Sequence, residues 1–340
     1  MKKKIKIHIR NNHWKEGFLP CDQEGEKHST ITKEEFEKGL NQYPEIKDKI
    51  EYLVDWDEDN YLSSMKEADI LLGWQFPTKN IREIAPNLKW IHIISAGVNH
   101  LSPFHWMKDK LVLTNSSGVH AKKAGEFGLM SILMLQNQMT KIVTNQKNRE
   151  FVTLLSKPIK GFKVIVVGTG SLGGSMIKHI SKLGAEVIGV NRKGNEVEGC
   201  SKVITFDKID EVLPIADFLY LAVPETEETK GLINKKRLDS LKHTCGIVNI
   251  GRDSVLDYES LRTKLEKNEI AGAILDVFTH EPIPKDSNLW NTPNLIITPH
   301  ISSDSQGNYI EMVLKIFFKN LKLFIEKKEL TNQIDRKLGY

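Results

Sequence analysis

Residues 163–173 read KVIVVGTGSLG, an apolar strand that leads directly into a glycine-rich turn. The glycines Gly168, Gly170 and Gly173 have the spacing GxGxxG, and an amphipathic helical pattern follows them. In a dinucleotide-binding turn the first glycine permits the tight turn, the second lets backbone amides approach a pyrophosphate, and the third allows close helix–strand packing. The helix N-terminus would offer free N–H groups to the phosphates. Together with a second strand at residues 186–190, this pattern predicts a dinucleotide-binding βαβ unit.

Strands and helices alternate on both sides of this unit. Before it, the sequence predicts strands at residues 5–9, 51–54, 69–72, 90–94 and 112–113, and helices at residues 33–40, 62–66, 81–84 and 100–107. After it, strands are expected at residues 217–223, 246–250, 271–275 and 295–298. Such alternation is typical of parallel sheets covered by helices. We therefore expect an α/β protein with two doubly wound parallel-sheet domains.

Two long helical stretches indicate how the domains are divided. Residues 121–148 form one predicted helix, and its part at residues 127–135 is apolar on nearly every side, which requires burial between domains or subunits. Residues 304–327 form a closing helix with a single apolar stripe and no strand after it. The closing helix is expected to return to the first domain. The interpretation is a substrate domain of residues 1–118 and 304–340, and a Rossmann cofactor domain of residues 119–303.

The end of the second strand of the unit bears on the choice of cofactor. A carboxylate there would bind the ribose 2′-OH of NAD, but the chain has Asn191 followed by Arg192 and Lys193. A 2′-phosphate would be repelled by a carboxylate and held by Arg192. The prediction is a preference for NADP with NAD still possible; the alternative is that the cations only form a solvated turn.

Composition excludes several classes of protein. The 48 basic and 44 acidic residues leave a net charge of only +4, which argues against a nucleic-acid partner. Cys21, Cys200 and Cys245 are far apart and lack metal-site spacing, so we expect reduced thiols and no metal. No apolar run is long enough to cross a membrane. The N-terminus alternates like a strand and not like a signal peptide, so the expected location is cytoplasmic.

Chemically useful side chains follow three late strands in succession. Arg252 follows the strand at residues 246–250, Asp276 and Glu281 follow the next strand, and His300 follows the last. Ligands of open α/β sheets bind at the carboxyl ends of the strands. Hydride transfer to a 2-keto acid needs a proton donor, a partner that keeps the donor charged, and a group that binds the substrate carboxylate. These residue types meet all three needs.

The chain resembles the D-isomer-specific 2-hydroxyacid dehydrogenases, over most of its length and most densely at residues 86–300. The segments that carry the resemblance are PNLKWI at 86–91, SAGVN at 95–99, Gly118 to Glu126, the turn at 168–173, residues 216–229, VNIGR at 248–252, LDVF at 275–278 with Glu281-Pro282, and Thr298-Pro299-His300. The resemblance implies that His300 is the general acid, that Glu281 raises its pKa, and that Arg252 binds the substrate carboxylate.

The same resemblance implies the remaining contacts. The backbone amides of Ala96, Gly97 and Val98 would bind the other carboxylate oxygen. Apart from the resemblance, Trp74 follows the strand at residues 69–72, so it is expected to wall the substrate pocket, with plain packing as the alternative. Asp276 would accept a hydrogen bond from the nicotinamide carboxamide, with a simple turn cap as the alternative. From the turn and the resemblance together, the expected cofactor contacts are Gly168, Thr169, Gly170, Ser171, Leu172, Gly173, Asn191, Arg192, Lys193, Val223, Pro224, Thr229, Ile250, Gly251, Asp276 and His300. Family members are usually homodimers through their cofactor domains, and the first domain closes over a cleft.

Three departures from the family pattern remain. Asn191 replaces the usual acidic residue, Asp253 replaces the usual glycine after the substrate arginine, and Ala124-Gly125 leaves more room near the nicotinamide than the usual Val-Ala. Asp253 would weaken the grip of Arg252 on an anion, or else point away from it.

The favoured function is reduction of a small 2-keto acid, such as glyoxylate or hydroxypyruvate, to the D-2-hydroxy acid. The alternatives are an NAD-linked enzyme like phosphoglycerate dehydrogenase, which the missing carboxylate at Asn191 disfavours, and a non-catalytic NAD(P) sensor like the corepressors of this fold. The presence of Arg252, Glu281 and His300 argues against the sensor.

Overall fold

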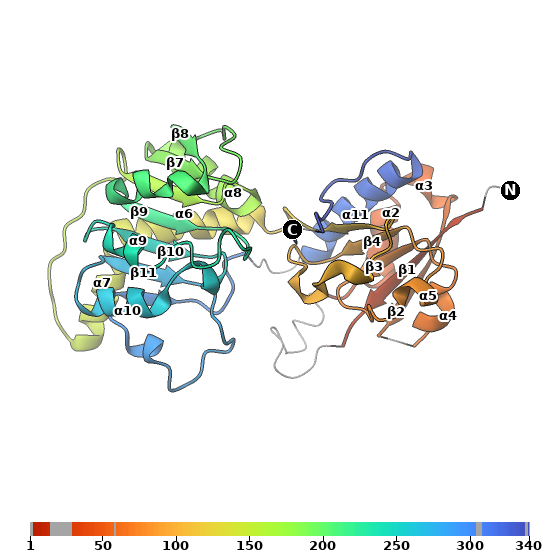
Figure 1. Cartoon of the computed structure of the whole chain (residues 1–340), viewed down its shortest axis with the longest axis horizontal. Helices are drawn as coiled ribbons and strands as arrows, with labels where there is room; N and C mark the ends of the chain where they lie inside the picture. The colour runs from red at the N-terminus through yellow and green to blue at the C-terminus, as the bar shows by residue number, and fades with distance from the viewer. Residues whose placement is uncertain (1–2, 14–28, 58, 304–307, 337–338, 340) are drawn as a thin grey trace. The chain divides into compact units, whose positions relative to one another are not determined.

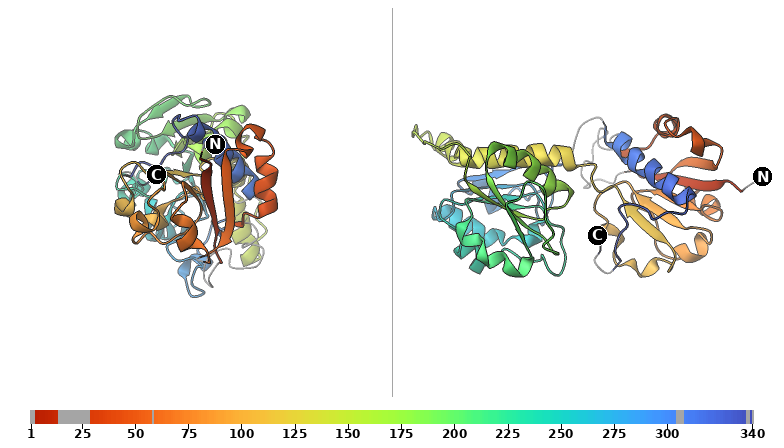
Figure 2. Two further views of the ribbon diagram at one scale, coloured as in Figure 1. Left: turned by 90° about the vertical axis from the view of Figure 1, so that its right-hand side faces the viewer. Right: turned by 90° about the horizontal axis from the view of Figure 1, so that it is seen from above.

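The structure is a computed structural model, and it describes residues 3–13, 29–57, 59–303, 308–336 and 339. The chain divides into two compact units, residues 1–119 with 305–340 and residues 120–304 (Figure 1). Each unit contains one parallel sheet with helices on both faces (Figure 2). The expected fold class of two doubly wound parallel-sheet domains is confirmed.

The first unit has a five-stranded parallel sheet in the order β2-β1-β3-β4-β5. Its strands are β1 (Ile5–Asn11), β2 (Ile50–Trp56), β3 (Ile70–Gly73), β4 (Trp90–Ile93) and β5 (Val112–Asn115). Its helices are α2 (Lys33–Leu40), α3 (Pro44–Lys47), α4 (Tyr61–Met65), α5 (Ile81–Ile84) and α11 (Tyr309–Ile325). The closing helix α11 buries Val313, Phe317 and Leu321 in the same core as Trp90 of β4. Its apolar stripe therefore covers this sheet.

One predicted helix of this unit is wrong. Residues 100–107 form two short 3₁₀ turns, η1 (Asn99–Leu101) and η2 (Phe104–Trp106), instead of one helix. Pro103 lies between them, and a proline disfavours helical backbone at the residue before it and removes an N–H donor. The turns are short because the proline interrupts them.

The second unit has a seven-stranded parallel sheet in the order β12-β11-β10-β9-β6-β7-β8. Its strands are β6 (Lys163–Val167), β7 (Glu186–Val190), β8 (Lys202–Ile204), β9 (Phe218–Leu221), β10 (Gly246–Asn249), β11 (Gly272–Leu275) and β12 (Leu295–Ile297). Its helices are α6 (Ala121–Gln136), α7 (Met139–Asn148), α8 (Ser171–Ile180), α9 (Lys235–Asp239) and α10 (Tyr258–Glu266). The sequence did not predict β8, a three-residue edge strand.

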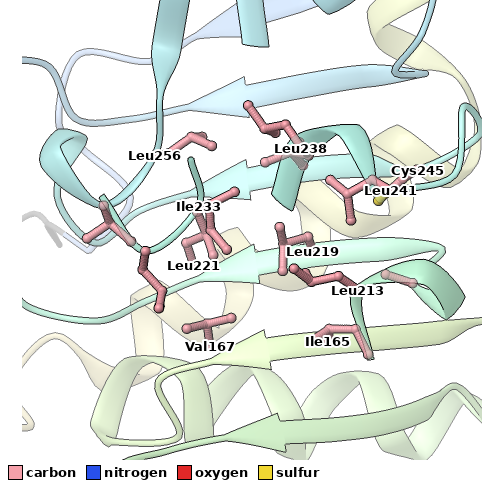
Figure 3. Close-up of a cluster of buried hydrophobic side chains, with 14 of the residues drawn as sticks. Ile165, Val167, Leu213, Leu219, Leu221, Ile233, Leu238, Leu241, Cys245 and Leu256 are labelled. Carbon is pink, nitrogen blue, oxygen red and sulfur yellow. The ribbon is translucent and has the colours of Figure 1, made fainter. Parts of the chain in front are cut away.

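Apolar side chains fill both faces of this sheet. Figure 3 shows one face, where Ile165 and Val167 of β6 and Leu219 and Leu221 of β9 pack beside Leu238 of α9. The strand order reverses between β6 and β9, and such a switch point is where open α/β sheets bind ligands. The loops after these strands therefore define the expected cofactor site.

The helix predicted over residues 121–148 is two helices. It breaks at Asn137 and Gln138, and Gln138 has a left-handed φ of 57°. One face of α6 is buried, and Met130 on the other face is 44% exposed in the single chain. Burial of that other face at a subunit interface stays a prediction. The space left by Gly125 is filled by α8, because a Cβ there would lie 2.2 Å from the Ser175 hydroxyl.

Three observations concern membrane spans, metal sites and cysteines. In the part of the chain that the structure describes, no helix is both long and apolar enough to span a membrane. The described residues also include no cluster of three or more His, Cys, Asp or Glu side chains that could hold a metal ion. Cys200 and Cys245 are free thiols, and Cys21 lies outside the described residues.

Candidate active site

The turn between β6 and α8 has the geometry that its glycines predicted. Gly168 has a φ of +94°, and a Cβ there would lie 2.5 Å from the Ala222 carbonyl oxygen of the strand end beside it. A Cβ on Gly173 would lie 1.9 Å from the Gly168 carbonyl oxygen. A Cβ on Gly170, the N-cap residue of α8, would meet no protein atom within 4 Å. The space beside the helix N-terminus is thus open, and free N–H groups at a helix N-terminus are the donors that a pyrophosphate requires.

Asn191 organises the turn that follows β7. Its side-chain oxygen accepts hydrogen bonds from the backbone N–H of Lys193 at 3.1 Å and of Gly194 at 2.7 Å. Its amide nitrogen donates to the Thr169 hydroxyl at 2.9 Å, which ties this turn to the glycine-rich turn. Arg192 is half-buried and Lys193 exposed. The two cations therefore belong to a defined turn beside the phosphate-binding loop.

His300 and Glu281 form a hydrogen-bonded pair at the carboxyl edge of the same sheet. Nδ1 of His300 lies 2.7 Å from Oε2 of Glu281, while Oε1 of Glu281 accepts from the backbone N–H of Phe278 at 2.8 Å. The side chain of His300 is 41% exposed, and no hydrogen bond joins its Nε2 to any described residue. Nε2 is thus the ring nitrogen that is available to a ligand.

The contact between the two side chains raises the pKa of His300 and lowers the pKa of Glu281. The hydrogen bond that His300 donates to Glu281 raises the pKa of His300 against the effect of burial, with further support from the charges of Glu281 and Asp276. Burial raises the pKa of Glu281, but its hydrogen bond to His300 and the nearby charges of His300 and Arg252 outweigh burial and lower that pKa. Both shifts favour the charged pair, an imidazolium beside a carboxylate, over the neutral pair.

Asp276 holds the turn that carries His300. Oδ1 accepts from the Thr298 hydroxyl at 2.5 Å and from the Ile301 N–H at 3.0 Å, and Oδ2 accepts from the Ser302 N–H at 3.0 Å. Asp276 is fully buried. The structure therefore shows the turn-capping role that the sequence left as an alternative, and the nicotinamide contact stays a prediction.

Arg252 lies close enough to the pair to affect both of its titrations, since its charge lowers the pKa of His300 as well as that of Glu281. Its Nη1 donates to the Gly251 carbonyl at 2.7 Å. Gly251 itself packs on the end of β9, because a Cβ there would lie 2.6 Å from the Val223 carbonyl oxygen. The second unit thus brings together Arg252, Glu281 and His300.

The other expected cofactor contacts lie in the loops after β9 and β10. Val223, Ile250 and Gly251 are buried and Pro224 is exposed. The Thr229 hydroxyl donates to the Pro224 carbonyl at 2.6 Å and accepts from the Thr226 N–H at 2.8 Å, so this side chain shapes its own loop. Thr169, Ser171 and Leu172 lie in or directly after the glycine-rich turn.

The expected substrate contacts of the first unit lie in the loop after β4. Its carbonyls are already used: Ala96 O accepts from the Asn115 side chain and Gly97 O from the Ser95 hydroxyl. The amides of Ala96, Gly97 and Val98 donate to no described residue. Trp74 stacks on His100 with ring centroids 4.8 Å apart. This loop thus offers donors to an anion, and Trp74 packs beside it.

Asn249, Tyr258 and Thr298 were not among the residues predicted to act at the site. Asn249 donates to the Arg252 carbonyl at 3.0 Å, and the Tyr258 hydroxyl donates to the Val277 carbonyl at 2.7 Å. Asn249 and Thr298 lie inside the segments that carry the family resemblance, which was the available signal. Tyr258 had no sequence signal, because its role depends on a loop 19 residues away.

Comparisons with known proteins bear on the family of the chain. Residues 129–302 match the family described as D-isomer specific 2-hydroxyacid dehydrogenase, NAD binding domain. A glyoxylate reductase from Thermofilum pendens is 30% identical over 280 residues, which cover 78% of this chain and 82% of that protein.

Solved structures of the same family have the same fold. A D-isomer specific 2-hydroxyacid dehydrogenase from Xanthobacter autotrophicus, in complex with NADPH and MES, has a TM-score of 0.80 at 22% identity, covering 99% of this chain and 100% of that one. A family protein from Aeromonas salmonicida has a TM-score of 0.75 at 27% identity, covering 97% and 99% of the two chains.

Proposed function

The chain belongs to the D-isomer-specific 2-hydroxyacid dehydrogenases, and on this premise we propose that it reduces small 2-keto acids such as glyoxylate or hydroxypyruvate to D-2-hydroxy acids. It is an NAD(P)-dependent oxidoreductase with an NAD-binding domain. The observation that carries the proposal is the pairing of His300 Nδ1 with Glu281 at 2.7 Å beside the charge of Arg252.

His300 is the proposed acid of the reduction. A bound nicotinamide cofactor supplies the hydride, and the Nε2–H of His300 gives its proton to the substrate carbonyl oxygen. Glu281 keeps the imidazole charged and fixes the ring through Nδ1. In the oxidative direction the neutral Nε2 takes the proton from the substrate hydroxyl. Arg252 binds the substrate carboxylate and polarises the carbonyl, for which a planar guanidinium is suited.

NADPH is the proposed preferred cofactor. The N-terminus of α8 and the open space at Gly170 would hold the pyrophosphate, and Arg192 with Lys193 would hold the 2′-phosphate. The turn that Asn191 organises supports this assignment. The NADPH found in the Xanthobacter structure agrees with it. The amides of Ala96, Gly97 and Val98 and the ring of Trp74 are proposed substrate contacts of the first unit.

A homodimer is the proposed assembly. The helix α6 exposes Met130, and the segment after α7 exposes Phe151 and Leu155. Large apolar side chains in contiguous segments are typical of subunit interfaces. A second copy of the chain is the partner that family membership favours.

The deciding experiment measures turnover of a panel of 2-keto acids with NADPH and with NADH. We expect reduction of glyoxylate or hydroxypyruvate, with a higher kcat/KM for NADPH. His300→Ala should lower kcat by about 10²–10⁴-fold and leave NADPH affinity unchanged, because it removes the general acid. His243→Ala changes an exposed histidine of the same unit and should have no effect.

The other outcomes separate the alternatives. A preference for 3-phosphohydroxypyruvate with NADH would favour a phosphoglycerate dehydrogenase. Binding of NADPH without turnover of any keto acid would favour a sensor and refute the enzymatic proposal.

A further inference from the structure

Two neighbouring loops carry the groups proposed to act on the substrate. The turn after β10 contains Arg252, and the loop after β11 contains Glu281. The two strands pair in parallel, with Asn249 opposite Leu275, so both loops leave the same edge side by side. The relative position of the two loops therefore decides how Arg252 lies with respect to Glu281 and, through it, His300.

The side chain of Asp253 turns toward the second loop and not toward Arg252. The backbone of Arg252 is extended, with φ −143° and ψ 147°, and successive side chains of extended chain point to opposite sides. Oδ2 of Asp253 accepts a hydrogen bond from the Thr279 hydroxyl at 2.6 Å. Among the described residues no ion pair joins Asp253 to Arg252. The carboxylate beside the substrate arginine is thus held by another partner.

A second contact joins the same two loops. The Tyr258 hydroxyl donates to the Val277 carbonyl at 2.7 Å and accepts from the Asn249 side chain at 3.1 Å. Asn249 also donates to the Arg252 carbonyl. The loop after β11 is therefore bonded to the Arg252 turn directly at Thr279 and, through Tyr258 and Asn249, at Val277. Glu281 follows Thr279 by only two residues.

We propose that Asp253 and Thr279 are positioning residues, whose hydrogen bond sets the loop that carries Glu281 against the turn that carries Arg252. This inference rests on the proposed function of His300, Glu281 and Arg252. A single hydrogen bond between exposed side chains adds little to global stability. Its effect is on local geometry, because a small displacement of Glu281 from His300 is expected to lower the rate of reduction. A glycine at position 253 would have no side chain for this contact.

The test compares variants that break this bond with variants that keep it. Thr279→Val and Asp253→Ala remove the donor and the acceptor, whereas Thr279→Ser and Asp253→Asn retain a hydroxyl and a side-chain oxygen. Ser254→Ala is the matched control. It breaks a bond of the same kind, from the Ser254 hydroxyl to Glu225 at 2.5 Å, which leads from the same turn to a different loop.

We expect Thr279→Val and Asp253→Ala each to lower kcat for keto-acid reduction roughly tenfold, with KM for NADPH unchanged. They should also move the alkaline fall of kcat to lower pH, because a displaced Glu281 supports the charge of His300 less well. The charged groups that act on His300 are Glu281, Asp276 and Arg252, and all variants retain them. The conservative variants and Ser254→Ala should behave as wild type.

An NMR titration of the His300 ring gives a readout independent of activity. The pKa of His300 should fall in Thr279→Val and Asp253→Ala and stay unchanged in the conservative variants and in Ser254→Ala. Wild-type titration and pH profile in both disruptive variants would overturn the proposal, as would an equal shift in Ser254→Ala. If the wild type reduces no keto acid, the proposed function fails, but the titration still decides the role of Asp253 and Thr279.

Discussion

At the scale of single residues, the site is built from carboxylates with separate tasks. Oε2 of Glu281 lies 2.7 Å from Nδ1 of His300, and this contact raises the pKa of the imidazole. Asp276 bonds Thr298, Ile301 and Ser302 and so holds the turn in which His300 has its left-handed φ of 54°. A left-handed backbone is uncommon outside glycine and needs support from its surroundings.

Glu281→Gln should shift the pH dependence of keto-acid reduction to lower pH. The Glu281 hydrogen bond raises the pKa of His300, so the protonated acid persists at higher pH than in a free histidine. Activity in reduction is full below that pKa and is lost as the pH rises through it. Without the carboxylate the loss begins at lower pH, and kcat in alkaline buffer should fall by about tenfold. The measurement is kcat against pH, and an unshifted alkaline limb would contradict the assignment.

Arg192→Ala should raise the KM for NADPH by about 10- to 100-fold and leave the KM for NADH unchanged. Only NADPH has the 2′-phosphate, and a charge-assisted contact with it is worth about 1.5–3 kcal/mol. Lys236→Ala removes an exposed cation of α9 and serves as the matched control. Steady-state kinetics with both cofactors measures the effect. Equal losses for NADH and NADPH would place Arg192 away from the phosphate.

At the scale of elements, the turn between β6 and α8 contains glycines with two different roles. One glycine is needed for packing within the protein, and the other leaves space beside the helix N-terminus. Gly173 is required by the protein itself, since a Cβ would overlap the Gly168 carbonyl oxygen at 1.9 Å. Gly170 faces open space, so the protein alone does not require it. The proposed pyrophosphate contact would supply the reason for a glycine at position 170.

Gly170→Ala and Gly173→Ala should therefore fail in different ways. Gly173→Ala forces the turn and α8 apart and should destabilise the protein by about 1–3 kcal/mol, besides weakening cofactor binding. Gly170→Ala should unfold at nearly the wild-type temperature but bind NADPH at least about tenfold more weakly, because its Cβ occupies space meant for the pyrophosphate. Thermal unfolding and NADPH titration of both variants distinguish the two effects. A similar loss of stability in Gly170→Ala would contradict the open space beside it.

At the scale of the whole molecule, the positions of the charged and exposed apolar side chains indicate more about ligands and assembly than their totals do. The net charge of +4 is small, but Arg192, Lys193 and Arg252 are cations proposed to meet anionic groups of the ligands. Large apolar side chains are exposed along the segment that follows α7, where Phe151 is 104% and Leu155 85% exposed. Such surface favours a partner subunit.

The proposed homodimer predicts a mass in solution of about twice the 38.8 kDa of the chain. Phe151→Asp with Leu155→Asp should shift the mass toward one chain, because charged side chains are costly at an apolar interface. Leu62→Asp changes a leucine of the first unit that is 58% exposed and should leave the mass unaltered. Light scattering coupled to size-exclusion chromatography measures all three proteins. A wild type that is monomeric at micromolar concentration would refute the homodimer.

Much of the fold could be predicted because its signals are local. Strand patterns such as Lys163–Val167 and Glu186–Val190 match the observed bounds, since a buried parallel strand needs a continuous apolar run. The glycine-rich turn was equally clear, because its glycines serve steric needs only a few residues apart. The break at Gln138 was missed because apolar residues continue beyond it at helical spacing. The 3₁₀ turns around Pro103 were missed although the proline is itself a local signal against a helix.

The type of chemistry could also be read from the chain, because Arg252, Glu281 and His300 each follow a strand of one parallel sheet. Parallel strands bring their carboxyl ends to one edge, so the order of residues already places these groups together. The finer arrangement depends on contacts between loops that are distant in sequence. Packing of these loops directs Asp253 to Thr279, gives both oxygens of Asp276 to the His300 turn, and leaves Nε2 of His300 facing no described partner. Side-chain direction and hydrogen-bond partners arise only when the loops fold against each other, and no local pattern in the sequence encodes them.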